Sequence, residues 1–137
     1  MTQKHTVLII DDDREPLKFY VKMLQHEYSV VHKSGPDETF EYISMNKNIR
    51  IVLLDVMMNP GAKYKFVDTK KGLITGVFLA KDLLKELPHT PIIIFTNASN
   101  PNTIAMFNET NVKAILQKID YPPFELKEYL DNIIRNE

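Results

Sequence analysis

The sequence contains no cysteine, which excludes a disulfide framework and thiolate chemistry and suits a reducing cytoplasm. It also lacks long hydrophobic runs: segments such as "VLII" and "IVLL" are far shorter than the roughly 18 apolar residues that a membrane-spanning helix needs. The polar N-terminus leads into a short strand, so we expect no signal peptide. We therefore expect a cytoplasmic protein without a membrane partner.

An excess of charge is missing as well, because 17 basic residues stand against 18 acidic ones and the formal net charge is -1. Such a balance gives no general attraction to nucleic acid, so we expect no nucleic-acid partner. A length of 137 residues suits one domain, which can bury enough apolar surface to be stable without disulfides or a structural metal. We expect a single domain over residues 1–137.

Short apolar runs alternate with amphipathic segments along the whole chain. The runs are rich in β-branched residues and predict strands buried on both faces, at 6–10, 28–32, 49–54, 91–96 and 112–117. Apolar residues at helical spacing between and after them predict helices, including shorter ones at about 36–45 and 102–109. Strict alternation of this kind predicts an α/β fold in which helices cover both faces of a parallel sheet.

Polar residues stand where these predicted strands end. Asp11 and Asp12 follow the first strand, Asp55 follows the third, Thr96 ends the fourth and Lys118 follows the fifth. Ligands of open α/β sheets bind at the carboxyl ends of the strands. With the strand order 2-1-3-4-5, three carboxylates, a hydroxyl and an ammonium group converge at one edge of the sheet.

These residue types predict phosphoryl chemistry assisted by a metal ion. Clustered carboxylates with carbonyl oxygens suit Mg²⁺, and an aspartate such as Asp55 is an established nucleophile for phosphoryl groups. Mg²⁺, Lys118 and Thr96 would balance the charge of a phosphoryl group. Carboxylates about 4 Å apart repel by roughly 4 kcal/mol at an effective dielectric constant of about 20, and a bridging cation offsets this cost. We expect Asp13 to act as an acceptor at the start of the following helix, and the histidines to lie on the surface.

Four motifs in this order, "VLIIDDD", "IVLLDVMMNPG", "PIIIFTN" and "ILQK", resemble the signatures of the response-regulator receiver domain of two-component signalling. The resemblance covers essentially the whole chain and implies a flavodoxin-like, five-stranded parallel sheet. It implies that Asp55 is the phospho-acceptor, with Thr96 as the switch hydroxyl and Lys118 as the site lysine. It further implies a Mg²⁺ site at Asp11, Asp12 and Asp55 and at the backbone carbonyl of Met57, with Asp12 the direct ligand of the acidic pair.

The resemblance also implies a function. A stand-alone receiver takes a phosphoryl group from a histidine kinase or a phosphotransfer protein and loses it by hydrolysis, so it is no enzyme beyond self-phosphorylation and self-dephosphorylation. The sequence stops at Glu137, directly after the last predicted helix. We therefore expect no effector domain, and an output through contacts with a further, unknown protein.

The sequence departs from the receiver pattern at three positions. Ile115 stands where the family usually has an aromatic residue, Ile119 where it has proline, and Asn97 where it has a small residue. These departures favour a second reading, a degenerate receiver that only binds partners. The intact acidic cluster favours phosphorylation.

A phosphatase of the haloacid-dehalogenase type is a third reading. Such an enzyme has an Asp-x-Asp motif at its first strand, which Asp11 and Asp13 would supply, with Thr96 and Lys118 on later strands. Arg14 occupies the place of a small hydroxyl residue or valine, and Asp55 would have no role. Both points favour the receiver.

The segment 58–75 is too long for an ordinary loop between a strand and a helix. "YKFV" (64–67) and "LIT" (73–75) have strand-like composition, and "DTKKG" between them has turn chemistry. Four lysines against one aspartate give it a charge of +3. We expect a basic β-hairpin over the phosphorylation edge, which selects an acidic partner or screens Asp55; the alternative is a solvated insertion without a role.

Overall fold

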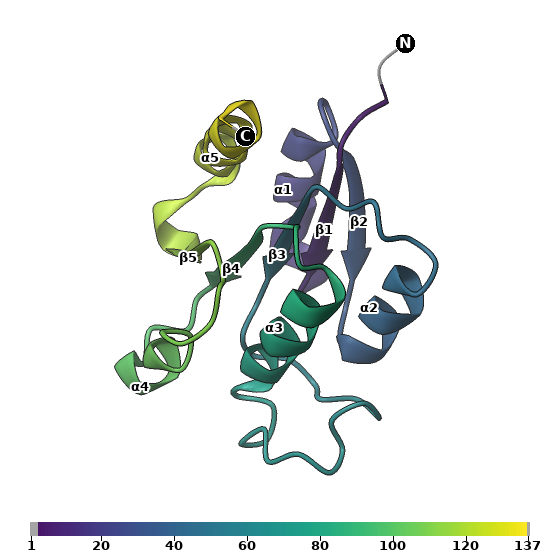
Figure 1. The fold of residues 1–137 in the computed structure, drawn as a ribbon. Helices are drawn as coiled ribbons and strands as arrows, with labels where there is room; N and C mark the ends of the chain where they lie inside the picture. Colours follow the sequence, from purple (N-terminus) through teal and green to yellow (C-terminus); the bar gives the residue numbers. More distant parts are fainter. Residues whose placement is uncertain (1–2, 137) are drawn as a thin grey trace.

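Five parallel strands form the centre of the computed structural model, which describes residues 3–136 (Figure 1). Their order is β2-β1-β3-β4-β5, as the sequence predicts. The strands are β1 (Thr6–Ile10), β2 (Ser29–Lys33), β3 (Ile51–Leu54), β4 (Ile92–Thr96) and β5 (Ala114–Gln117).

Helices cover both faces of this sheet: α2 and α3 pack on one face, and α1 and α5 on the other (Figure 1). The chain also forms the short helix α4 and one turn of 3₁₀ helix, η1. Their bounds are α1 (Arg14–Leu24), α2 (Pro36–Ile43), α3 (Thr75–Glu86), α4 (Pro101–Ala105), η1 (Lys118–Asp120) and α5 (Pro123–Arg135). Among the described residues, no helix has the length and apolarity needed to cross a membrane.

Alternating side chains of each strand fill two apolar layers. Leu8 and Ile10 of β1 pack under α2 and α3, whereas Val7 and Ile9 pack under α1 and α5. Complete burial of a side chain of this size contributes about 1.5–3 kcal/mol. Because both faces are covered, the central strands β1, β3 and β4 are apolar except for a threonine at one end of β1 and of β4, and the charged side chains follow where the strands end.

Residues 55–74, between β3 and α3, contain no strand, so the predicted β-hairpin is wrong. The segment is a series of turns that extends past the carboxyl edge of the sheet, below α2 and α3 in Figure 1. Side chains of the neighbouring helices hold it: Asp37 of α2 accepts the backbone N–H groups of Ala62 and Lys63, both at 2.8 Å. These tertiary hydrogen bonds outweigh local strand propensity, because an isolated two-stranded hairpin is only marginally stable.

Tyr64 fixes the middle of this insertion to α3. Its side chain is buried, its ring lies against Phe78, and its hydroxyl donates to Asp82 at 2.5 Å. Burial and the hydrogen bond to Asp82 raise the pKa of the Tyr64 hydroxyl. The insertion is therefore a folded loop with its own buried anchor.

We expect Tyr64→Phe to lower the free energy of unfolding by about 1.5 kcal/mol, because a hydrogen bond to a charged group is lost while the ring stays in place. Urea denaturation measures the loss. Phe66→Ala is the matched control, since the Phe66 side chain is 93% exposed and should contribute nothing measurable. Equal stability of wild type and Tyr64→Phe would contradict the anchoring role.

Candidate functional site

The register of β1 and β3 places the two key aspartates side by side. Ile10 pairs with Leu54, so Asp11 and Asp55 are the next residues on adjacent strands. The backbone N–H of Asp55 donates to the Ile10 carbonyl at 2.9 Å. Asp11 is 2% exposed and Asp55 8% exposed, so both carboxylates lie largely out of water. An isolated pair of buried carboxylates would be costly, which requires a compensating positive charge nearby.

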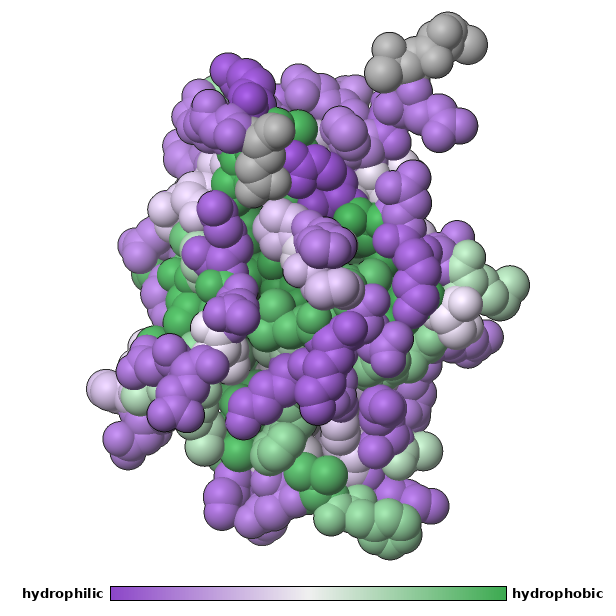
Figure 2. Space-filling view, viewed as in Figure 1, coloured by the Kyte–Doolittle hydropathy of each residue, from purple (hydrophilic) through white to green (hydrophobic). Residues whose placement is uncertain are grey.

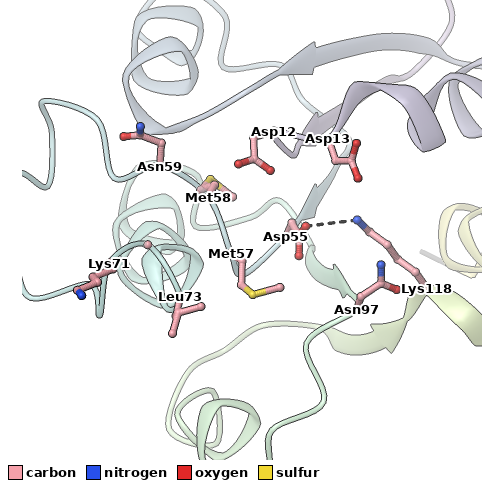
Figure 3. Close-up of a pocket in the computed structure, with 11 residues that line it drawn as sticks. Asp12, Asp13, Asp55, Met57, Met58, Asn59, Lys71, Leu73, Asn97 and Lys118 are labelled. Carbon is pink, nitrogen blue, oxygen red and sulfur yellow. Dashed lines mark hydrogen bonds and ion pairs between the residues drawn. The ribbon is translucent and has the colours of Figure 1, made fainter.

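Lys118 supplies that charge from the end of β5. Its Nζ atom lies 2.6 Å from Asp11 Oδ2 and 3.3 Å from Asp55 Oδ2, and Figure 3 marks the contact with Asp55. The sheet therefore brings together Asp11, Asp55 and Lys118, as the sequence predicts from three different strand ends. The buried cation is shared by both carboxylates.

The electrostatics of this cluster follow from its burial. Burial, and then the charge of Asp55, raise the pKa of Asp11, while Lys118 opposes them. The same two causes raise the pKa of Asp12. For Lys118, burial disfavours the ammonium form, but the nearby charges of Asp55 and Asp11 outweigh it and raise its pKa. The cluster therefore keeps Lys118 charged and attracts further positive charge.

An open pocket of about 360 Å³ lies over this cluster (Figure 3). Of the residues predicted for the site, Asp12, Asp55, Met57 and Lys118 line it. The complete lining is Asp12, Asp13, Asp55, Met57, Met58, Asn59, Lys71, Gly72, Leu73, Asn97 and Lys118.

Thr96 does not line this pocket. Its side chain is buried at the end of β4, where its hydroxyl oxygen accepts the N–H of Ala98 at 3.0 Å. Asn97, the next residue, lines the pocket instead. In this arrangement the Thr96 hydroxyl stabilises the turn that follows β4. Its contact with a phosphoryl group stays a prediction.

The donor atoms around the pocket fit a small hard cation. Within residues 3–136, no three acidic or histidine side chains form a metal-binding group by themselves. Mg²⁺ needs few carboxylates, because it keeps several water ligands and also accepts carbonyl oxygens. Asp12 and Asp55 line the pocket together with Met57, whose backbone carbonyl is the predicted third ligand. The Asp11 carboxylate forms an ion pair with Lys118, which leaves Asp12 as the better direct ligand for Mg²⁺.

Two details near Asp11 differ from the sequence-based expectations. Asp13 precedes α1, but its side chain makes no capping hydrogen bond; instead its N–H donates to Asp11 Oδ1 at 2.9 Å. His32, predicted to lie on the surface, is half-buried, and its Nε2 is 2.7 Å from the Asp11 carbonyl oxygen. Both contacts hold Asp11 in place, and the contact with the Asp11 carbonyl accounts for the partial burial of the His32 side chain.

The backbone after Lys118 forms the turn η1, and no cis peptide bond occurs in the described part of the chain. The receiver pattern has a proline at the position of Ile119. The peptide bond between Lys118 and Ile119 is trans, and the Ile119 side chain is exposed. Ile115 is half-buried at β5 and packs against the core.

Sequence reasoning missed the pocket residues Asn59, Lys71, Gly72 and Leu73, which the insertion contributes. The unusual length of the segment after Asp55 indicated an insertion over this edge of the sheet, but not which of its residues line the pocket. The chain returns to the pocket because the Met58 N–H donates to the Gly72 carbonyl at 3.1 Å.

Comparisons with known proteins agree on the fold. No protein-family model and no curated protein sequence matches the chain. Among solved structures, it is similar to a response regulator from Thermotoga maritima (TM-score 0.73, 18% identity, covering 96% of this chain and 98% of that one). It is also similar to a CheY-like receiver domain protein from Methanospirillum hungatei JF-1 (TM-score 0.78, 19% identity, covering 98% and 96%).

A third similar structure is the RcsB response regulator of Salmonella typhimurium, with a TM-score of 0.74 and 21% identity. That match covers 99% of this chain and 62% of RcsB. Identities this low establish the fold and leave the activity to be argued from the site. The sheet order, the nearly complete coverage and these neighbours lead to one conclusion: the chain has the flavodoxin-like fold of response-regulator receiver domains.

Proposed function

We propose that this protein is a phospho-accepting receiver of a two-component phosphorelay, in which Asp55 takes the phosphoryl group. The observation that carries this proposal is that Asp55 lines an open pocket together with Asp12 and Lys118, with the Lys118 Nζ atom 3.3 Å from Asp55 Oδ2. A nucleophilic carboxylate, a fixed cation and a second carboxylate at an accessible site are the parts that phosphoryl transfer needs.

In the proposed reaction, an Asp55 oxygen attacks the phosphorus of a phosphohistidine on a histidine kinase or phosphotransfer protein. The bond between phosphorus and the histidine nitrogen breaks as the bond to Asp55 forms. Lys118 is already held within reach of Asp55 and balances the added negative charge without reorganisation. Mg²⁺, held by Asp12, Asp55 and the Met57 carbonyl, would supply further positive charge at the phosphoryl oxygens.

The chemistry of this site is limited to the protein's own carboxylate. We therefore assign it no catalysis beyond gain and loss of its own phosphoryl group, and an output through contacts with an unknown protein. A phosphatase of the haloacid-dehalogenase type would use Asp11 as nucleophile. The Asp11 carboxylate instead accepts hydrogen bonds from the Lys118 ammonium group and from the Asp13 N–H, and it does not line the pocket.

The test is intact-mass spectrometry after treatment with a small phosphodonor, with and without Mg²⁺. We expect the wild-type protein to gain one phosphoryl group only with Mg²⁺, and Asp55→Asn and Asp12→Ala to gain little or none. Asp120→Asn is the matched control, because Asp120 is an exposed carboxylate outside the pocket and should leave phosphorylation unchanged.

Each competing function has its own signature in this experiment. Stable phosphorylation of Asp55→Asn would refute Asp55 as the acceptor. Donor turnover that is lost in Asp11→Asn but kept in Asp55→Asn would establish the phosphatase. A wild-type protein that takes up no phosphoryl group at any Mg²⁺ concentration would establish the degenerate receiver.

A further inference from the structure

The insertion is fastened to the backbone that follows Asp55. The Met58 N–H donates to the Gly72 carbonyl at 3.1 Å, and the Thr75 hydroxyl donates to the Met58 carbonyl at 2.7 Å. The Gly72 N–H in turn donates to the Thr69 hydroxyl oxygen at 3.1 Å. Residues 69–75 are therefore attached to residues 56–58 by hydrogen bonds in both directions.

Gly72 makes this close approach possible. Its φ of +89° lies in the region that favours glycine, and a Cβ there would stand 2.7 Å from the Met58 carbonyl oxygen. Together with the hydrogen bonds of Asp37 to the insertion and of Tyr64 in the insertion to Asp82 of α3, this contact makes residues 71–73 a fixed wall of the pocket.

The wall presents an apolar side chain to a polar pocket. Leu73 is 56% exposed and lines the pocket beside Met57, which is 40% exposed. Figure 3 shows both side chains on the side of Asp55 away from Lys118. Scattered exposed leucines need no explanation. Leu73, however, is held at the mouth of a pocket whose other side chains include Asp12, Asp13 and Asn97.

Of the four lysines of the insertion, Lys71 lines the pocket, whereas Lys63, Lys65 and Lys70 do not. The Lys71 side chain points away from Asp55 (Figure 3), Lys70 pairs with Asp68, and Lys63 lies over the Phe40 ring at 4.1 Å. Of the insertion residues that line the pocket, Leu73 therefore supplies an exposed apolar side chain, whereas the ammonium group of Lys71 is directed away from Asp55.

We propose that Leu73 limits the access of water to the phosphoryl group on Asp55 and thereby sets how long the protein stays phosphorylated. This inference rests on the proposed function. In the hydrolysis that it slows, a water oxygen bonds to phosphorus as the bond from phosphorus to Asp55 breaks. The products are the Asp55 carboxylate and inorganic phosphate, and the water proton passes to phosphate or solvent. Exclusion of water by the walls of a site is a recognised protection for such intermediates. Leu73 is a positioning residue, because it touches no reacting group of the protein.

The experiment follows the loss of the phosphoryl group after the donor is removed, with Mg²⁺ present, by intact mass over time. We expect Leu73→Ser to lose phosphate roughly three- to tenfold faster than wild type, because water then enters the pocket more easily. Leu73→Phe should lose it more slowly, and Leu73→Met should restore the wild-type lifetime. Phe66→Ser is the matched control: it removes an exposed apolar side chain of the same insertion that does not line the pocket.

The outcomes separate this inference from the proposed function. A wild-type lifetime in Leu73→Ser overturns the inference while phosphorylation of Asp55 stands. Equally fast loss in Phe66→Ser also overturns it, because the effect would then belong to the loop as a whole. Absence of any phosphoryl group on the wild-type protein overturns the proposed function, and the inference with it. Urea denaturation of each variant checks that the fold is retained.

Discussion

Gly76→Ala is expected to unfold at a much lower urea concentration than the wild-type protein, with a loss of about 3 kcal/mol or more in the free energy of unfolding. A Cβ at this position in the first turn of α3 would stand 2.3 Å from the Asp55 carbonyl oxygen and 2.6 Å from the Val56 Cα. Both atoms are backbone and cannot rotate away. The Gly76 N–H also donates to the Val56 carbonyl at 2.7 Å, so a shift of α3 breaks a short hydrogen bond.

The same substitution should impair the site. Asp55 is positioned by the backbone that Gly76 contacts, and displacement of that backbone moves the carboxylate relative to Lys118. We therefore expect slower phosphoryl uptake by the folded fraction of Gly76→Ala as well as lower stability.

Gly35→Ala is the matched control for this experiment. A Cβ at Gly35 would lie 3.7 Å from the Asn59 carbonyl oxygen, which is ordinary contact, and the Gly35 φ of -174° suits any residue. It should change stability by less than about 1 kcal/mol. If Gly76→Ala and Gly35→Ala unfold together with the wild type, the close approach of α3 to Asp55 is refuted.

The part of this fold that could be predicted from the sequence is the repeated alternation of strands and helices. Alternation of β-branched runs with amphipathic segments predicted a parallel sheet covered by helices on both faces, but the ends of the strands were less certain. The predicted strand 49–54 begins at Ile51, although the Arg50 N–H already donates to the Thr6 carbonyl at 2.9 Å. Hydrophobic runs extend past the paired residues, because apolar side chains are buried beyond the last ladder hydrogen bond as well. Burial alone therefore does not mark the end of a strand.

α4 shows the same limit for a helix. The sequence predicts a helix over 102–109, but α4 ends at Ala105 and continues as tight turns, in which the Phe107 N–H donates to Ile104 and that of Thr110 to Phe107. These turns bury the Phe107 side chain, whereas no residue of α4 itself is buried. The backbone after Ala105 forms turns that place the Phe107 side chain in the core. The helical spacing of apolar residues in the sequence does not predict this packing.

The site was predictable for a geometric reason. A parallel sheet gathers the carboxyl ends of its strands at one edge, so Asp11, Asp55 and Lys118 had to converge once the strand order was known. The insertion was not predictable in this way. Its conformation depends on contacts such as Asp37 with Ala62, between residues 25 positions apart, and such pairs leave no periodic signal in the sequence.

The strongest electrostatic prediction concerns Lys118. We expect Lys118→Met to lower the free energy of unfolding of the metal-free protein by about 3 kcal/mol, since removal of one partner of a buried ion pair leaves uncompensated charge. Asp11 and Asp55 would then face each other with little water to screen them, because both are nearly buried. Lys18→Met is the control: its partner Glu15 is exposed, and an exposed pair contributes at most about 1 kcal/mol.

A double-mutant cycle separates this charge effect from lost packing. Asp11→Asn removes one of the two carboxylates that Lys118 neutralises, so Lys118→Met should cost much less in the Asp11→Asn background. We expect a coupling of about 0.5–3 kcal/mol between the two substitutions, the range found for residues in direct contact. Urea denaturation in the presence of a chelator measures all four proteins. Strictly additive losses would mean that Lys118 stabilises the fold through its aliphatic chain alone. The contacts of 2.6 Å and 3.3 Å would then contribute no net electrostatic stability.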